Sequence, residues 1–124
     1  MNKIQDDDQP VVSSNGTQSW WKNGQIHRDN DLPAIINPDG SKYWYKNGKP
    51  HRDNDLPANI KADGTQRWYQ EGYLHRGNDL PAVIWADGTQ FWFKTGENHR
   101  GKGLPAAIHP DGSQEFWVNG KFVK

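Results

Sequence analysis

The sequence predicts an all-β protein built as a single-layer antiparallel array of about five β-hairpins. Three observations lead to this prediction. A 24-residue unit repeats without insertion, with copies that start near residues 15, 39, 63, 87 and 111. Each copy contains two glycine turns, and no segment shows helical periodicity. A fixed period of this length is typical of repeat proteins, in which each unit buries its apolar face against its neighbours.

Each unit is expected to contain two strands and two turns. In the copy that starts at Asp39, an aromatic strand covers residues 41–45, a turn follows at Asn47-Gly48, and a return strand lies around residues 56–60. Asn-Gly and Asp-Gly pairs tolerate the positive φ angles of tight hairpin turns, and β-branched or aromatic residues flank both. The proline at the start of each return strand excludes helix and is tolerated at the first position of a strand.

The repeats define one domain, residues 10–124, after a disordered acidic leader at residues 1–9. The leader contains three consecutive aspartates, and the repeats begin and end on incomplete units. Strands left open near residues 10–12 and 116–123 expose unpaired backbone groups, which favours pairing with another chain. We therefore expect a homodimer or a small homo-oligomer.

Composition argues against several classes of function. Fifteen basic residues balance fifteen acidic residues, so the formal net charge is zero and no nucleic-acid partner is expected. The chain has no cysteine, which removes disulfides and thiolate chemistry. No apolar stretch has the length of a signal peptide or a membrane span. We expect a soluble, cytoplasmic protein with no integral membrane segment.

One aromatic position is almost constant and is interpreted as the core. It is occupied by Trp20, Trp44, Trp68, Trp92 and Phe116. The Leu-Pro-Ala-x-Ile segments place leucine, alanine and isoleucine at alternate positions, which in a strand share one face. We expect the tryptophans to stack over these residues rather than to form a ligand platform. Burial of each tryptophan should contribute about 2 to 3 kcal/mol.

The alternate positions vary between copies and form the candidate binding face. A second aromatic line, from Trp21 to Trp117, is expected on the same side. In repeat proteins constant positions build the scaffold, whereas variable positions on one face build a binding surface. Cross-strand aromatic support is the alternative role. The predicted partner-binding residues are Tyr43, Tyr45, Arg67, Tyr69, Trp85, Phe91 and Phe93.

The His-Arg pairs at residues 27–28, 51–52, 75–76 and 99–100 are the strongest candidates for chemistry. Equivalent residues two or three strands apart are separated by roughly 10 to 14 Å. A zinc ion requires its ligands at about 2 Å, so the histidines cannot share one. We expect each imidazole to cap a turn carbonyl, and each arginine to bind a loop acid or to lie on an aromatic ring.

The remaining motifs also argue against an enzyme. The acidic loop at residues 29–31 suggests calcium, but the equivalent loops become Gly77-Asn78-Asp79 and Gly101-Lys102-Gly103. The serines lie in or beside turns, outside any nucleophile-elbow context. We therefore predict no catalytic residue, no metal and no cofactor.

The unit resembles a variant of the MORN repeat. The resemblance rests on Tyr-x-Tyr-x-Asn-Gly at residues 43–48, the following His-Arg, and the Pro-Ala-x-Ile-x-x-Asp-Gly return at residues 57–64. It covers about residues 13–124, and it departs from the MORN pattern where Trp44-Tyr45 and Asp55-Leu56-Pro57 replace glycine positions. Similar variants occur in bacterial, phage and giant-virus proteins. The resemblance implies a hairpin array used for protein contacts or membrane association, without catalytic residues.

These observations lead us to expect a non-enzymatic protein-interaction or scaffold module, of which a phage- or virus-encoded inhibitor of a host protein would be one form. A weaker resemblance links the unit to Trp-Tyr repeats that bind choline or cell-wall glycan. The rings of Tyr45, Tyr69 and Phe93 could stack on sugars or hold a quaternary amine. The lack of an export signal argues against this alternative.

Overall fold

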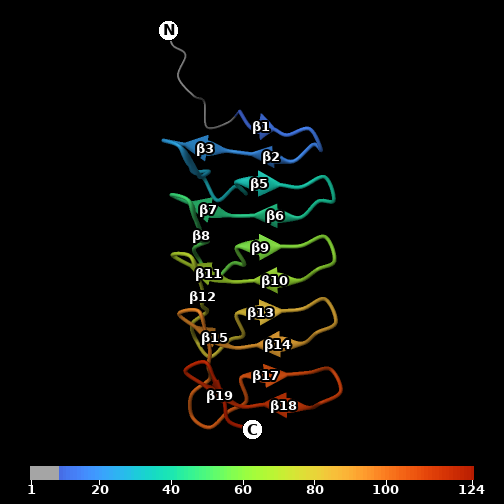
Figure 1. Cartoon of the computed structure of the whole chain (residues 1–124), viewed down its shortest axis with the longest axis vertical. Coiled ribbons are helices and arrows are strands. Elements are labelled where there is room, and N and C mark those ends of the chain that lie inside the picture. Colours follow the sequence, from blue (N-terminus) through green and yellow to red (C-terminus); the bar gives the residue numbers. More distant parts are fainter. Residues whose placement is uncertain (1–8) are drawn as a thin grey trace.

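The computed structural model describes residues 9–124, and these form an elongated all-β array without a helix. The units follow one another along the long axis from the amino end to the carboxyl end (Figure 1). This confirms the predicted hairpin array. No helix capable of crossing a membrane occurs in residues 9–124. The predicted leader lies outside the described residues, apart from Gln9.

Ten two-residue strands of the described chain form one antiparallel main sheet, in the order β1-β2-β5-β6-β9-β10-β13-β14-β17-β18. Each strand between the two edge strands, β1 and β18, pairs with one neighbour across a turn and with another in the adjacent unit. Tyr43, for example, faces Ile35 on one side and Asn59 on the other. The main-sheet strands are β1 (Val11–Val12), β2 (Gln18–Ser19), β5 (Ile35–Ile36), β6 (Lys42–Tyr43), β9 (Asn59–Ile60), β10 (Gln66–Arg67), β13 (Val83–Ile84), β14 (Gln90–Phe91), β17 (Ala107–Ile108) and β18 (Gln114–Glu115).

Five small hairpins stack along one side of the main sheet (Figure 1). At the turn of the second hairpin, φ is 51° at Asn47 and 81° at Gly48, as a type I′ turn requires. The Gly48 amide donates to the Ile26 carbonyl of the preceding hairpin at 2.9 Å. The hairpins are β3 (Trp21–Lys22) with β4 (Gln25–Ile26), β7 (Tyr45–Lys46) with β8 (Lys49–Pro50), β11 (Tyr69–Gln70) with β12 (Tyr73–Leu74), β15 (Phe93–Lys94) with β16 (Glu97–Asn98), and β19 (Trp117–Val118) with β20 (Lys121–Phe122).

Each aromatic strand is interrupted at its constant aromatic residue, which differs from the continuous strand that the pattern predicts. β6 ends at Tyr43 and β7 begins at Tyr45. Between them, the Trp44 amide donates to the Ala58 carbonyl at 2.7 Å, whereas the Trp44 carbonyl accepts from the His51 amide at 3.1 Å. The chain therefore leaves the main sheet and enters the hairpin at the tryptophan, and the two tyrosines belong to different sheets.

The Asp-Gly turns differ in type from the Asn-Gly turns. Gly40 has a positive φ of 93°, but Asp39 does not. The Gly40 amide donates to the Asn37 carbonyl, and the Asn37 amide donates to the Ser41 carbonyl, both at 2.9 Å. Asp39 Oδ1 accepts from the Ser41 amide at 2.8 Å. The aspartate is therefore useful here as a side-chain acceptor, and only the glycine supplies the left-handed conformation.

Acid should weaken the array through these turn aspartates. Hydrogen bonds from the backbone amide and the hydroxyl of Thr65 lower the pKa of Asp63, and the pKa of Asp39 is lowered in the same way by Ser41. An aspartate whose pKa is lowered by folding stabilises the folded state at pH values above its unfolded pKa, which is near 4. This stabilisation is lost as the pH falls through the pKa of the folded state. We expect the urea midpoint to decrease as the pH is lowered from about 5 to about 3.

Asparagine provides the matched control, because Asn15 occupies the aspartate position in the first unit. Its Oδ1 accepts from the Thr17 amide at 3.0 Å, so a neutral side chain supports the same turn. An Asp39→Asn, Asp63→Asn double variant should therefore lose less stability between those two pH values than the parent chain. Identical acid profiles for the two proteins would contradict this explanation.

The core lies where the main sheet meets the hairpins, and the tryptophan prediction is confirmed. The four constant tryptophans are only 4 to 7% exposed, and Ala34, Ala58, Ala82 and Ala106 are completely buried beside them. Phe116 and the isoleucines that follow the alanines, such as Ile36, are half-buried. The core of this strongly polar chain thus consists of a few large aromatic side chains packed beside small alanines.

The prediction that the leucines belong to this core is wrong. Leu32, Leu56, Leu80 and Leu104 are 37 to 40% exposed. The residues before Leu32 explain the difference, because Asn30 and Asp31 both have positive φ angles, 65° and 57°. This tight turn changes the chain direction before the strand begins, so strand alternation does not extend back to the leucine.

Candidate functional site

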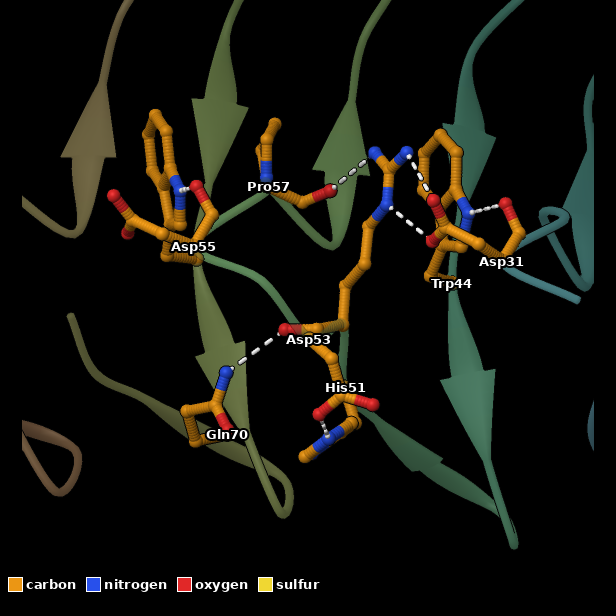
Figure 2. A network of polar contacts seen from close by, with 9 residues as sticks. Asp31, Trp44, His51, Asp53, Asp55, Pro57 and Gln70 are labelled. Carbon is orange, nitrogen blue, oxygen red and sulfur yellow. Dashed lines mark hydrogen bonds and ion pairs between the residues drawn. The ribbon is translucent and has the colours of Figure 1, made fainter.

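A repeated polar cluster joins each unit to the next and centres on the arginine of the His-Arg pair. The guanidinium of Arg52 lies over the Trp44 ring, 3.8 Å from its centre. Its Nε and Nη2 donate to the carboxylate of Asp31 at 2.8 and 3.2 Å, and its Nη1 donates to the Pro57 carbonyl at 3.1 Å (Figure 2). The same contacts recur in the next two units. Both predicted roles of the arginine are confirmed together.

The loop that supplies Asp31 has a defined structural role. Asn and Asp are among the few residues other than glycine that adopt left-handed angles readily, so the Asn30-Asp31 pair suits the tight turn. The Asp31 carbonyl accepts from the indole Nε1 of Trp44 at 3.1 Å (Figure 2). Asp31 thus holds both the Trp44 ring and the Arg52 guanidinium of the next unit. The sequence did not reveal this role.

The repeated histidines accept from a turn amide rather than donating to a turn carbonyl, so this prediction is wrong. His51 Nδ1 accepts from the Glu71 amide in the next unit at 3.0 Å. Because Nδ1 is the acceptor, the neutral ring carries its proton on Nε2. His51 Nε2 lies 2.7 Å from Asp53 Oδ1 (Figure 2). This hydrogen bond is the main cause of the lowered pKa of Asp53.

The histidine environment changes halfway along the array. His27 and His51 each pair with an aspartate two residues later and are 6 and 8% exposed. Glycine replaces that aspartate after His75 and His99, which are half-buried. In residues 9–124, the Nε2 atoms of these two histidines make no hydrogen bond.

Shallow concavities lie between successive units on the His-Arg side. The concavity between the first two His-Arg loops has a volume of about 240 Å³, and its equivalent between the third and fourth has about 440 Å³. Within the described chain, no three His, Cys, Asp or Glu side chains are grouped to hold a metal ion. The predicted absence of catalytic, metal and cofactor sites stays a prediction.

A buried hydroxyl position lies beside the Asp-Gly turns, on the side of the main sheet away from the five hairpins, and has a structural role there (Figure 1). Ser41 is 1% exposed, and its Oγ accepts from the Ala62 amide in the next unit at 2.9 Å. Thr65 makes the same bond to Ala86. The equivalent partner of Thr89 would be Pro110, which has no amide proton, and the Thr89 hydroxyl donates instead to its own turn aspartate. The hydroxyls of Ser41 and Thr65 therefore hold successive turns together.

The predicted partner-binding residues are divided between the two kinds of sheet. Tyr43, Arg67 and Phe91 lie in β6, β10 and β14 of the main sheet, Tyr45, Tyr69 and Phe93 begin β7, β11 and β15 of the hairpins, and Trp85 lies in the turn after β13. Burial, followed by the neighbouring Tyr69 and Tyr43, raises the pKa of Tyr45.

Trp85 and Phe91 belong to a connected surface at the carboxyl end, whereas Phe93 lines the concavity between the third and fourth His-Arg loops. The rings of Trp85 and Phe91 are 4.9 Å apart, and those of Phe91 and His109 are 6.0 Å apart. His109 Nε2 lies 3.0 Å from Glu115 Oε2, and Trp117 Nε1 donates to Glu115 Oε1 at 3.0 Å. The Trp117 ring in turn lies 5.3 Å from Phe122. We call these six residues the C-terminal aromatic surface.

Four members of this surface were missing from the predicted set: His109, Glu115, Trp117 and Phe122. The first three occupy the variable columns or the second aromatic line, so the column pattern could have identified them. Phe122 lies outside those columns, and its contribution depends on the hairpin register that pairs it with Trp117.

No protein-family model matches this sequence, and no curated protein matches it either.

Proposed function

We propose that the protein is a non-enzymatic interaction module that binds a protein partner through the C-terminal aromatic surface. The observation that supports this proposal is the continuous set of contacts from Trp85 to Phe122, with Trp85 43% exposed and Phe122 59% exposed. Tryptophan and other aromatic residues are enriched at the centres of protein interfaces. A group of this kind at the surface of a chain with few apolar residues is a candidate binding site.

The support beneath this surface favours binding further. Val83 and Ala107, the cross-strand neighbours of Phe91, are 4% and 0% exposed. Glu115 holds His109 on one side and Trp117 on the other through its two carboxylate oxygens. Side chains already held in place lose less conformational entropy when a partner binds. Arg67 extends the surface, since it lines a shallow concavity with Trp85.

Removal of the exposed rings should weaken binding without unfolding the protein. A partner recovered by affinity capture from the native source would be titrated against Trp85→Ala and Phe91→Ala variants. We expect at least a tenfold increase in Kd for each variant, because truncation of an interface hot spot commonly costs about 2 kcal/mol. The melting temperature should stay close to that of the parent chain.

Tyr73→Ala is the matched control, because Tyr73 is also an exposed aromatic residue but lies outside the C-terminal aromatic surface. It should bind the partner normally. Normal binding by the Trp85→Ala and Phe91→Ala variants would show that the wrong face has been chosen. Retention of the protein on choline or glycan resin, with no protein partner recovered, would favour the carbohydrate alternative.

The proposal also includes the expected family, inhibitory role, cellular location and self-association of the protein. The MORN-like assignment, an inhibitory role against a host protein and a cytoplasmic location rest on sequence alone. Self-association is favoured by Val11 and Val12 at one end and by Phe122 and Val123 at the other, all of which are exposed. Analytical sedimentation over a range of concentrations tests it, since a constant monomer mass would contradict it.

A further inference from the structure

The first unit contains a carboxylate held by two donors, and this arrangement serves as an internal template. Asp29 accepts from His27 Nε2 at 2.7 Å and from Lys22 Nζ at 3.4 Å. The second unit repeats the histidine contact, with His51 Nε2 2.7 Å from Asp53 Oδ1. The fold thus places an anionic oxygen beside Nε2 of the repeated histidine wherever the loop supplies one.

The fourth unit keeps the donors and loses the acid. Lys94, His99 and Gly101 occupy the positions of Lys22, His27 and Asp29, since each lies 72 residues later (94 − 22, 99 − 27 and 101 − 29). The next residue changes from asparagine to Lys102. His99 Nδ1 accepts from the Asn119 amide at 2.9 Å, so Nε2 carries the proton of the neutral ring and can donate.

These side chains line one concavity of about 440 Å³, together with Trp92 and Phe93. Its two arginines are already paired with Asp55 and Asp79. Lys94 and Lys102 make no ion pair with any residue from 9 to 124. In the part of the chain that the structure describes, Asp79 is the one acid that lines this concavity, and it is already paired with Arg100, while Lys102 also contributes to its lowered pKa. Lys94 and Nε2 of His99 therefore have no carboxylate beside them within the described residues. The equivalent concavity of the first two units is instead lined by three aspartates.

We propose that the concavity formed by Lys94, His99 and Lys102 is an oxyanion site that takes a carboxylate of an acidic side chain on the partner. The position of Asp29 in the first unit shows which group the local backbone and the two donors accommodate. Lys102 adds a cation that the first unit lacks, and charge-assisted hydrogen bonds to a carboxylate are stronger than neutral ones. The choice of a protein as the source rests on the proposed function, whereas the oxyanion site does not.

The test observes His99 directly. The imidazole nitrogen signals of the histidines would be followed by NMR while a capped tri-aspartate peptide is added at constant pH and ionic strength. Capped tri-asparagine and inorganic phosphate would be added in parallel. We expect a saturable shift at His99 with tri-aspartate and no comparable shift at His27 or His51, whose Nε2 atoms already face an aspartate. Tri-asparagine should leave His99 unchanged.

Gly101→Asp is the decisive variant, because it should restore the template within the fourth unit. A Cβ at Gly101 meets no atom within 4 Å, and the residue does not adopt a left-handed backbone conformation, so the variant should fold. Its own carboxylate should then occupy the site and weaken tri-aspartate binding at least tenfold. Lys94→Gln should also weaken binding, whereas Lys121→Gln, which changes a lysine outside this concavity, should not.

Each outcome has a defined meaning. A His99 signal that does not respond to tri-aspartate, or a response that persists fully in Gly101→Asp, would overturn the proposal. A response to phosphate alone would overturn the carboxylate assignment and identify a free anion as the ligand. A response of His99 to tri-aspartate supports the site even where Trp85→Ala still binds the partner, so the two proposals can fail separately.

Discussion

Replacement of Trp68 by alanine should lower the free energy of unfolding by about 3 to 5 kcal/mol, the usual cost of removing a buried tryptophan. Trp68 is 5% exposed, lies under the guanidinium of Arg76 at 3.8 Å, and donates from Nε1 to the Asp55 carbonyl at 3.1 Å. It also stands in a central unit, so its loss removes support from both neighbours. Urea unfolding at neutral pH measures the change.

Two further variants separate the causes of this loss. Trp68→Phe keeps an aromatic ring, as Phe116 does in the last unit, but removes the indole donor, and it should cost less than the alanine variant. Trp85→Ala removes a tryptophan that is 43% exposed and should lower the free energy of unfolding by clearly less than Trp68→Ala does. Equal losses for Trp68→Ala and Trp85→Ala would contradict a core built on the constant tryptophans.

The fold could be predicted because the repeat shows the same local signals five times. The Asn47-Gly48 pair predicts a tight turn by its conformational preference alone, and the structure has that turn. The sheet change at Trp44 could not be predicted, since the aromatic run Tyr43-Trp44-Tyr45 is typical of one continuous strand. It is the hydrogen bonding of Trp44, with its amide in one sheet and its carbonyl in the other, that divides the strand.

The polar contacts between units were only partly predictable, because most of them join residues about 20 positions apart. The contacts of Arg52 with an acid and with an aromatic ring could be predicted from the chemistry of arginine. Its partner Asp31 could not be chosen over Asp53 or Asp55 without the stacking of units. The histidine prediction failed for a related reason, since His51 faces an amide of the next hairpin, and that amide is brought close only by tertiary structure.

The early units have an aspartate two residues after the repeated histidine, and the late units have a glycine there. The sequence shows this difference, but its effect on the histidine is visible only in the structure. In the sequence alone, the change from Asp29 to Gly101 serves only as an argument against a calcium site. The structure shows instead that Asp29 is the hydrogen-bond partner of His27. A substitution at this position therefore changes the chemistry of a neighbouring imidazole, and comparison of copies becomes informative once their contacts are known.

Removal of Arg76, the arginine of the His-Arg pair in a central unit, should also destabilise the protein strongly. Arg76→Ala loses the ring contact with Trp68, two hydrogen bonds to Asp55 and one to the Pro81 carbonyl. We expect the free energy of unfolding to fall by about 2 kcal/mol, because the Arg76 side chain is largely buried, although Asp55 is exposed and its ion pair is weakened by solvent.

Lysine at the same position separates charge from geometry. Arg76→Lys keeps one positive charge but cannot form the forked bond to Asp55 or lie flat on the Trp68 ring, so most of the loss should remain. Arg67→Ala is the control, because Arg67 makes no ion pair with the described residues and should change stability by less than about 0.5 kcal/mol. Urea unfolding of the three variants under one set of conditions gives the comparison. If Arg76→Lys were as stable as the parent chain, charge alone would hold the units together, and the planar contacts of the guanidinium with Asp55 and Trp68 would contribute nothing.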